Sequence, residues 1–137
     1  MDTKIIILDV NNIARDIINE AGQVIKDGGL VAFPTETVYG LGANALDKNA
    51  VEKIFKAKGR PQDNPLIVHV ANCNIENLVK EVPNIANEIM SKYWPGPITL
   101  IFNKSELIPD TTSAGLKTVG IRMPSKIGKS TRLNSSH

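Results

Sequence analysis

The chain has 137 residues, of which 42% are hydrophobic and 22% are charged, which fits one soluble globular domain built around one core. No apolar run approaches the length needed to span a bilayer. The apolar run at the N-terminus is too short, and is followed by an acidic residue too early, for a secretory signal. The single cysteine, Cys73, excludes an internal disulfide and favours a reducing compartment, so we expect a cytoplasmic protein.

The net charge of +2 comes from the C-terminal end of the chain. Three of the 16 basic residues lie after Pro124, where there is no acidic residue. Residues 1–124 therefore hold 13 basic and 14 acidic residues, a net charge of −1. Global charge does not favour nucleic acid as a partner, although a local basic patch around Lys53, Lys56, Lys58 and Arg60 is compatible with one.

The first half of the chain alternates predicted strands and helices. A short apolar strand at 4–8 precedes a helix at 13–25, which Asn11 or Asn12 caps and Gly28 and Gly29 end. A strand at 30–33 closes at Pro34. Asp47 then caps a second helix, whose inner face is formed by Ala50, Val51, Ile54 and Phe55.

The second half continues the same pattern. We expect strands at 66–70, 98–102 and 118–123, and helices at 75–80 and 83–93. Strands alternating with helices predict an α/β fold in which a twisted, mixed sheet is flanked by helices. Residues 125–137 show no apolar periodicity, so we expect one domain over 1–124 and a non-native or disordered tail after it.

Hydroxyl side chains gather just after the strand at 30–33. Thr35, Thr37 and Tyr39 alternate along the chain, so in an extended segment they face one side. Converging hydroxyls offer donors and acceptors to an amino acid or a carboxylate. The same pattern also fits a half-buried strand followed by turn hydroxyls, and the residues alone leave both interpretations open.

Two cations stand in a glycine–proline turn at the end of the second helix. Gly59 and Pro61 flank Arg60, and Lys58 precedes them. Arginine offers a planar fork to phosphate oxygens and lysine a point charge, but cations at a helix C-terminus also simply compensate its dipole. Asn64, before Pro65, is set in extended backbone and can offer an amide to a ligand.

Two further polar residues interrupt predicted strands. Arg122 lies between Ile121 and Met123, where a charge needs a partner or a ligand. His69 lies between Val68 and Val70 and has no second histidine or nearby cysteine at ligand spacing, so a zinc site is not expected. A lone histidine on a strand can also be purely structural.

Together these residues resemble the Sua5/YciO/YrdC family over about residues 10–124. Four ordered motifs carry the resemblance, and they lie at residues 34–42, at 58–69, at 94–99 and at 119–124. The family's best-known activity is threonylcarbamoyl-AMP synthesis for tRNA modification. The resemblance thus implies a nucleotidyltransferase that converts L-threonine, bicarbonate and ATP into threonylcarbamoyl-adenylate and pyrophosphate, which partner proteins use to modify tRNA.

The resemblance also implies roles for single residues. Threonine would be held by Thr37, His69 and Arg122. ATP and its phosphates would be held by Lys58, Arg60, Asn64 and Thr118, with Lys58 and Arg60 supplying the catalytic charge and Mg²⁺ bridging phosphate oxygens. Thr35 and Tyr39 would shape the cleft, and no protein ligand set for a metal is expected.

One departure from the family pattern concerns the nucleotide site. Family members continue after the Arg-Met-Pro element with a Ser-x-Asn motif that completes this site, whereas residues 125–132 here show nothing similar. We therefore expect a fold that is incomplete at its C-terminal end and synthase activity that is weak or absent in these 137 residues.

Two other functions compete with this one. A domain of this fold that binds double-stranded RNA or tRNA without synthase activity would use the lysines at 53–60, although six aromatic residues and the charge of 1–124 give it little support. A carbamoyl-transfer domain of the hydrogenase-maturation type shares the fold, but it usually belongs to a larger chain with zinc-binding motifs.

Overall fold

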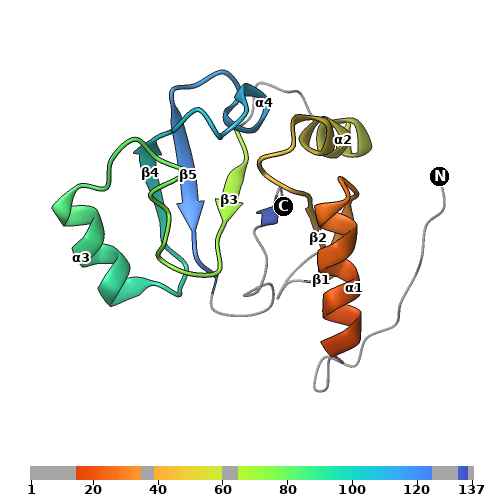
Figure 1. Ribbon diagram of the computed structural model, residues 1–137, viewed down its shortest axis with the longest axis horizontal. Helices are drawn as coiled ribbons and strands as arrows, with labels where there is room; N and C mark the ends of the chain where they lie inside the picture. Colours follow the sequence, from red (N-terminus) through yellow and green to blue (C-terminus); the bar gives the residue numbers. More distant parts are fainter. Residues whose placement is uncertain (1–14, 35–38, 60–64, 125–132, 136–137) are drawn as a thin grey trace.

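A computed structural model describes residues 15–34, 39–59, 65–124 and 133–135 (Figure 1). The helices are α1 (Arg15–Lys26), α2 (Lys48–Lys58), α3 (Asn84–Tyr93) and the short α4 (Asp110–Ser113). The strands are β1 (Val31–Pro34), β2 (Tyr39–Gly42), β3 (Ile67–His69), β4 (Thr99–Asn103), β5 (Thr118–Arg122) and β6 (Leu133–Ser135).

The described strands form two sheets. β1 and β2 pair antiparallel, and the larger sheet has the order β4-β5-β3-β6. In that sheet β3 runs parallel to β5, while β4 and β6 run antiparallel to their neighbours, so the sheet is mixed. β6 also contacts β2 and thereby lies between the two sheets. The predicted α/β class with a mixed sheet is confirmed.

Two clusters of buried side chains form the core. The first joins the larger sheet to α3 and includes Val68, Phe102 and Ile121. The second packs α2 against the β1–β2 end of the molecule and includes Phe55 and Leu66. Figure 1 shows α3 beside β4 at one end and α1 beside β1 and β2 at the other. Because Leu66 and Val68 are two residues apart, the start of β3 connects the two clusters.

Helix α2 begins and ends as its sequence predicts. The Asp47 carboxylate accepts hydrogen bonds from the backbone N–H groups of Asn49 (3.0 Å) and Ala50 (3.3 Å). Gly59 ends the helix with φ of 62°, a conformation that glycine adopts without a side-chain clash. The predicted inner face is buried, so both the boundaries and the orientation of α2 are confirmed.

The short helix α4 is hydrogen-bonded to segments of both core clusters. The buried Thr112 Oγ1 donates a 2.8 Å hydrogen bond to the Ala45 carbonyl, and the Thr112 carbonyl accepts one from Leu66 N–H at 3.0 Å. Lys104, just after β4, donates a 2.6 Å hydrogen bond to Asp110, which holds the pKa of this exposed carboxyl below its usual value. These contacts fix β3, β4 and the start of α2 around α4.

The helix predicted at 75–80 is wrong. This segment is a turn in which Val79 forms an isolated bridge to Lys104, and Lys80 N–H donates to the Asn103 carbonyl at 2.9 Å. Pairing with the end of β4 therefore outweighs the local helical pattern. Strands β2 and β6 and helix α4 were not predicted, whereas α3, β3, β4 and β5 agree with their predicted segments within a few residues. The predicted strand at 4–8 and the caps Asn11 and Asn12 lie outside the described residues.

Candidate functional site

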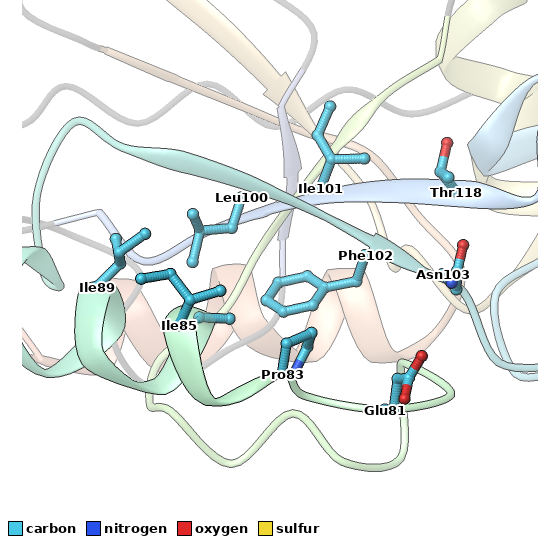
Figure 2. A pocket seen from close by; sticks show the side chains of 10 residues that line it. Glu81, Pro83, Ile85, Ile89, Leu100, Ile101, Phe102, Asn103 and Thr118 are labelled. Carbon is cyan, nitrogen blue, oxygen red and sulfur yellow. The ribbon is translucent and has the colours of Figure 1, made fainter.

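The larger sheet has one face packed on α3 and one face turned away from it. On β5, Val119 and Ile121 are buried, while Thr118, Gly120 and Arg122 alternate with them and point the opposite way. Figure 2 shows the same division on β4, where Leu100 and Phe102 point toward α3 and Ile101 points away. We call the side turned away from α3 the far face of the sheet.

Three polar residues align on the far face in what we call the polar row. His69 of β3 pairs with Arg122 of β5, and Thr99 of β4 pairs with Arg122 from the other side. Paired residues of neighbouring strands point to the same face and lie about 5 Å apart along the sheet. Residues separated by 53 positions in sequence, His69 and Arg122, are thus brought together at the carboxyl ends of two parallel strands.

Arg122 has a buried donor without an acceptor. Its Nε is shielded from solvent and has no hydrogen-bond partner among the described residues. The Arg122 side chain as a whole is partly buried, and its backbone carbonyl accepts a 2.9 Å hydrogen bond from Val70 N–H. A shielded guanidinium N–H is expected to have an acceptor. A planar anion such as a carboxylate provides one in the geometry that arginine prefers.

Thr118 occupies the same face at the opposite end of β5. It pairs with Asn103 of β4 and lies four positions before Arg122, which corresponds to about 13 Å of extended strand. The far face of β5 is therefore a strip with Arg122 at one end, Thr118 at the other and Gly120 between them. Its length exceeds that of a free amino acid.

Lys58 lies in the last turn of α2 and is exposed, and Gly59 redirects the chain immediately after it. The predicted residues Arg60 and Asn64, which follow, lie outside the described residues, as do Thr35 and Thr37. Tyr39 begins β2, where its backbone pairs with Pro34. The predicted cleft between residues 35–39 and residues 58–64 thus stays a prediction.

A hollow of about 280 Å³ lies between α3 and the edge strand β4. Figure 2 shows that apolar side chains of both elements line it, including Ile85, Ile89 and Phe102. Thr118 is the one predicted site residue in its wall, and the polar row is not part of it. This hollow, whose wall also includes Glu81 and Asn103, lies at the sheet edge and is distinct from the polar row.

The sequence analysis missed two residues of the far face, Thr99 and Gly120. A Cβ atom on Gly120 would lie 3.2 Å from Thr99 Cγ2 and 3.9 Å from Ile67 Cγ1. Alternation along residues 118–122 already indicated that Gly120 shares a face with Arg122. The position of Thr99 depends on the register between β4 and β5, which no local pattern encodes.

Comparison with known proteins identifies the family of the chain. The family model Sua5/YciO/YrdC, described as "Telomere recombination", matches residues 23–128. The chain belongs to the Sua5/YciO/YrdC family. Among the described residues, no helix is long and apolar enough to cross a membrane.

Two relatives of the chain are named as threonylcarbamoyl-AMP synthases. The chain is 57% identical over 108 residues to the threonylcarbamoyl-AMP synthase of Pyrococcus abyssi, covering 78% of this chain and 32% of that protein. It is 50% identical over 109 residues to the threonylcarbamoyl-AMP synthase of Bacillus subtilis, with the same two coverages. The chain thus spans about a third of the length of these relatives.

A solved structure supports the fold. The crystal structure of P. abyssi Sua5 complexed with L-threonine superposes with a TM-score of 0.84 at 48% sequence identity, covering 91% of this chain and 39% of that one. The mixed sheet therefore belongs to the same fold as this solved relative.

Proposed function

We propose that this chain carries the L-threonine site and part of the ATP site of an L-threonylcarbamoyladenylate synthase. The reaction joins L-threonine, bicarbonate and ATP into threonylcarbamoyl-AMP and releases pyrophosphate, and the product serves tRNA modification by partner proteins. The observation that carries the proposal is the shielded, unpartnered Nε of Arg122 in register with His69. The names of the two synthase relatives and the threonine complex of the P. abyssi protein support it.

The amino-acid end of the site is built on the polar row. Arg122 would bind the threonine carboxylate, because a guanidinium and a carboxylate form a bidentate, charge-assisted pair. His69 stands one strand away on the same face and would contact the polar groups of the same ligand, with Thr37 completing the set. The amino group is left to react with bicarbonate.

The nucleotide end would involve Thr118 and residues at and after the end of α2. Lys58, Arg60, Asn64 and Thr118 would hold ATP and its phosphates. Thr118 lies about 13 Å along β5 from Arg122, so the two ligands would occupy different parts of the far face. Thr35 and Tyr39 would shape the cleft between them.

Catalysis in this site would depend on alignment and charge, without a covalent nucleophile. The threonine amine would attack the carbon of bicarbonate, and a C–O bond would break as water leaves with a proton from the amine, giving a carbamate. A carbamate oxygen would then attack the α-phosphorus, and the bond from that phosphorus to pyrophosphate would break. Holding the reactants in line and neutralising the developing phosphate charge lowers both barriers. Lys58 and Arg60 would supply the positive charge.

The described residues offer no group of three or more His, Cys, Asp or Glu side chains placed to hold a metal. We propose that Mg²⁺ enters with ATP, bound to its phosphate oxygens, as divalent cations commonly do in nucleotide-dependent enzymes.

The roles of Lys58 and Arg60 can be tested in a full-length relative. Replacing the residues aligned with either position by alanine should reduce threonine- and bicarbonate-dependent pyrophosphate release by about 100-fold or more, in line with lost transition-state charge stabilisation. Undiminished release in either variant would contradict the role of that residue. For the 137-residue chain we expect weak or absent release, and robust threonine-dependent release would show this expectation to be wrong.

Binding of double-stranded RNA or tRNA without synthase activity is the competing function. Lys53, Lys56 and Lys58 are all exposed, and Lys53 also donates a 3.0 Å hydrogen bond to the Gly28 carbonyl. These lysines are the described residues that such a function would use. RNA binding that falls steeply with salt and needs no ATP would favour this function.

A further inference from the structure

The far face of the sheet has an apolar row directly beside the polar row. Gly120 of β5 pairs with Ile67 of β3 on one side and Ile101 of β4 on the other. Both isoleucines are exposed, at 37% and 72% of their surface, respectively. Apolar side chains on a partly open face, next to an arginine whose shielded Nε has no acceptor among the described residues, are suited to an amphipathic ligand.

Gly120 makes a shallow cup in this row. The position of a Cβ on Gly120 is 3.2 Å from the Thr99 methyl carbon, Cγ2, and 3.9 Å from Ile67 Cγ1. Apart from Gly120 itself and its chain neighbours Val119 and Ile121, no other heavy atom of the described residues lies within 4 Å of that position. Two aliphatic groups therefore border the cup at its sides, and the backbone of Gly120 forms its base.

The backbone at Gly120 does not itself require glycine. Among the described residues, positive φ angles occur at Gly28, Gly59, Gly115 and Ala114, and Gly120 has ordinary strand geometry. A glycine inside a strand weakens the strand and often marks a place where another molecule approaches the backbone closely. The backbone conformation therefore does not explain why residue 120 is a glycine.

We propose that Gly120 is a specificity-determining residue, whose cup receives the side-chain methyl group of the amino acid bound by Arg122. This inference rests on the proposed threonine site and adds to it the contact that distinguishes threonine from serine. With the carboxylate on Arg122, a ligand extending along β5 reaches the apolar row next, where the Thr99 methyl, Ile67 and the Gly120 backbone surround a single methyl group.

The test compares L-threonine and L-serine binding to the purified chain by isothermal titration calorimetry. Wild-type protein should bind threonine about tenfold more tightly than serine or better, the range expected for one methyl group in an apolar site. Gly120→Ala should weaken threonine binding by a similar factor and affect serine less, because its Cβ fills the cup. The preference between the two ligands should then largely disappear.

A second variant separates ligand space from packing within the protein. Gly120→Ala/Thr99→Ser removes Thr99 Cγ2, which relieves the 3.2 Å contact, and keeps the hydroxyl. Thr99→Ser alone is the reference for this double variant, and urea unfolding establishes that each variant is folded. The double variant should discriminate less between threonine and serine than Thr99→Ser does.

Three outcomes would overturn the inference. If Gly120→Ala keeps the wild-type preference for threonine, the cup does not hold the methyl group. If the double variant regains that preference, the effect of alanine came from its contact with Thr99. If the wild-type chain binds neither amino acid, the proposed threonine site fails together with the inference, whereas in the first two outcomes that site stands.

Discussion

At the scale of single residues, Arg122 shows what a sequence can and cannot predict. A charge between two apolar strand residues predicts that a partner or a ligand is needed. Arg122 Nε is shielded and has no acceptor among the described residues, so the ligand stays a prediction. The sequence could not predict that His69 and Thr99 would be its neighbours in register. That proximity depends on strand order and register, which arise from pairing between distant segments.

Replacing Arg122 should remove most of the affinity for L-threonine. Arg122→Ala is expected to weaken binding about tenfold or more, because a hydrogen bond to a charged group contributes about 1.5–3 kcal/mol. Arg122→Lys should bind with intermediate affinity, since lysine keeps the charge but not the planar fork. Calorimetric titration with threonine measures both. Lys117→Ala, an equal change of charge at an exposed position before β5, is the control, and an equal loss of affinity in this variant would contradict a specific role for Arg122.

At the scale of elements, prediction succeeded where local signals were sufficient. Asp47 and Gly59 marked the ends of α2, and its apolar face followed the helical period. The segment at 75–80 failed because its backbone pairs with the end of β4 instead of with itself. Helix α4 was missed because only four residues form it and its stability comes from the contacts of Thr112 and Lys104.

Two adjacent threonines of α4 should respond in opposite ways to the same substitution. Thr112→Val removes the 2.8 Å hydrogen bond to the Ala45 carbonyl and leaves that carbonyl without its donor, so the free energy of unfolding should fall by about 1–3 kcal/mol. Thr111 Oγ1 is buried without a partner among the described residues, so Thr111→Val should be neutral or stabilising. Urea unfolding measures both variants, and equal destabilisation would show that the Thr112 bond is not what holds α4.

At the scale of the whole molecule, the two core clusters should unfold as one unit. Leu66 belongs to one cluster and Val68 to the other. Thr112 of α4 is hydrogen-bonded to Ala45, before α2, and to Leu66, before β3. Composition indicated one domain's worth of core, which stays a prediction, and it does not encode the division of the buried side chains into two clusters.

A distant substitution tests this coupling. Phe55→Ala in the second cluster should lower stability by about 3–5 kcal/mol. Trp94, the single tryptophan, is buried in the first cluster, so its fluorescence reports on unfolding at the other end of the molecule. Fluorescence and far-UV circular dichroism should shift to the same lower urea midpoint. A shift in circular dichroism with an unchanged fluorescence midpoint would show that the two clusters unfold independently.

The alternation of β5 links correct folding to ligand recognition. Val119 and Ile121 face the core, while Gly120 and Arg122 face the other way. A shift of one residue in the pairing of β5 would bury the Arg122 guanidinium among apolar side chains. It would also expose Val119 and Ile121 to water. A chain with this register error would therefore be less stable than the native fold, whether or not a substrate is present. The same alternation of side chains thus favours the native register and places the charge of Arg122 on the far face.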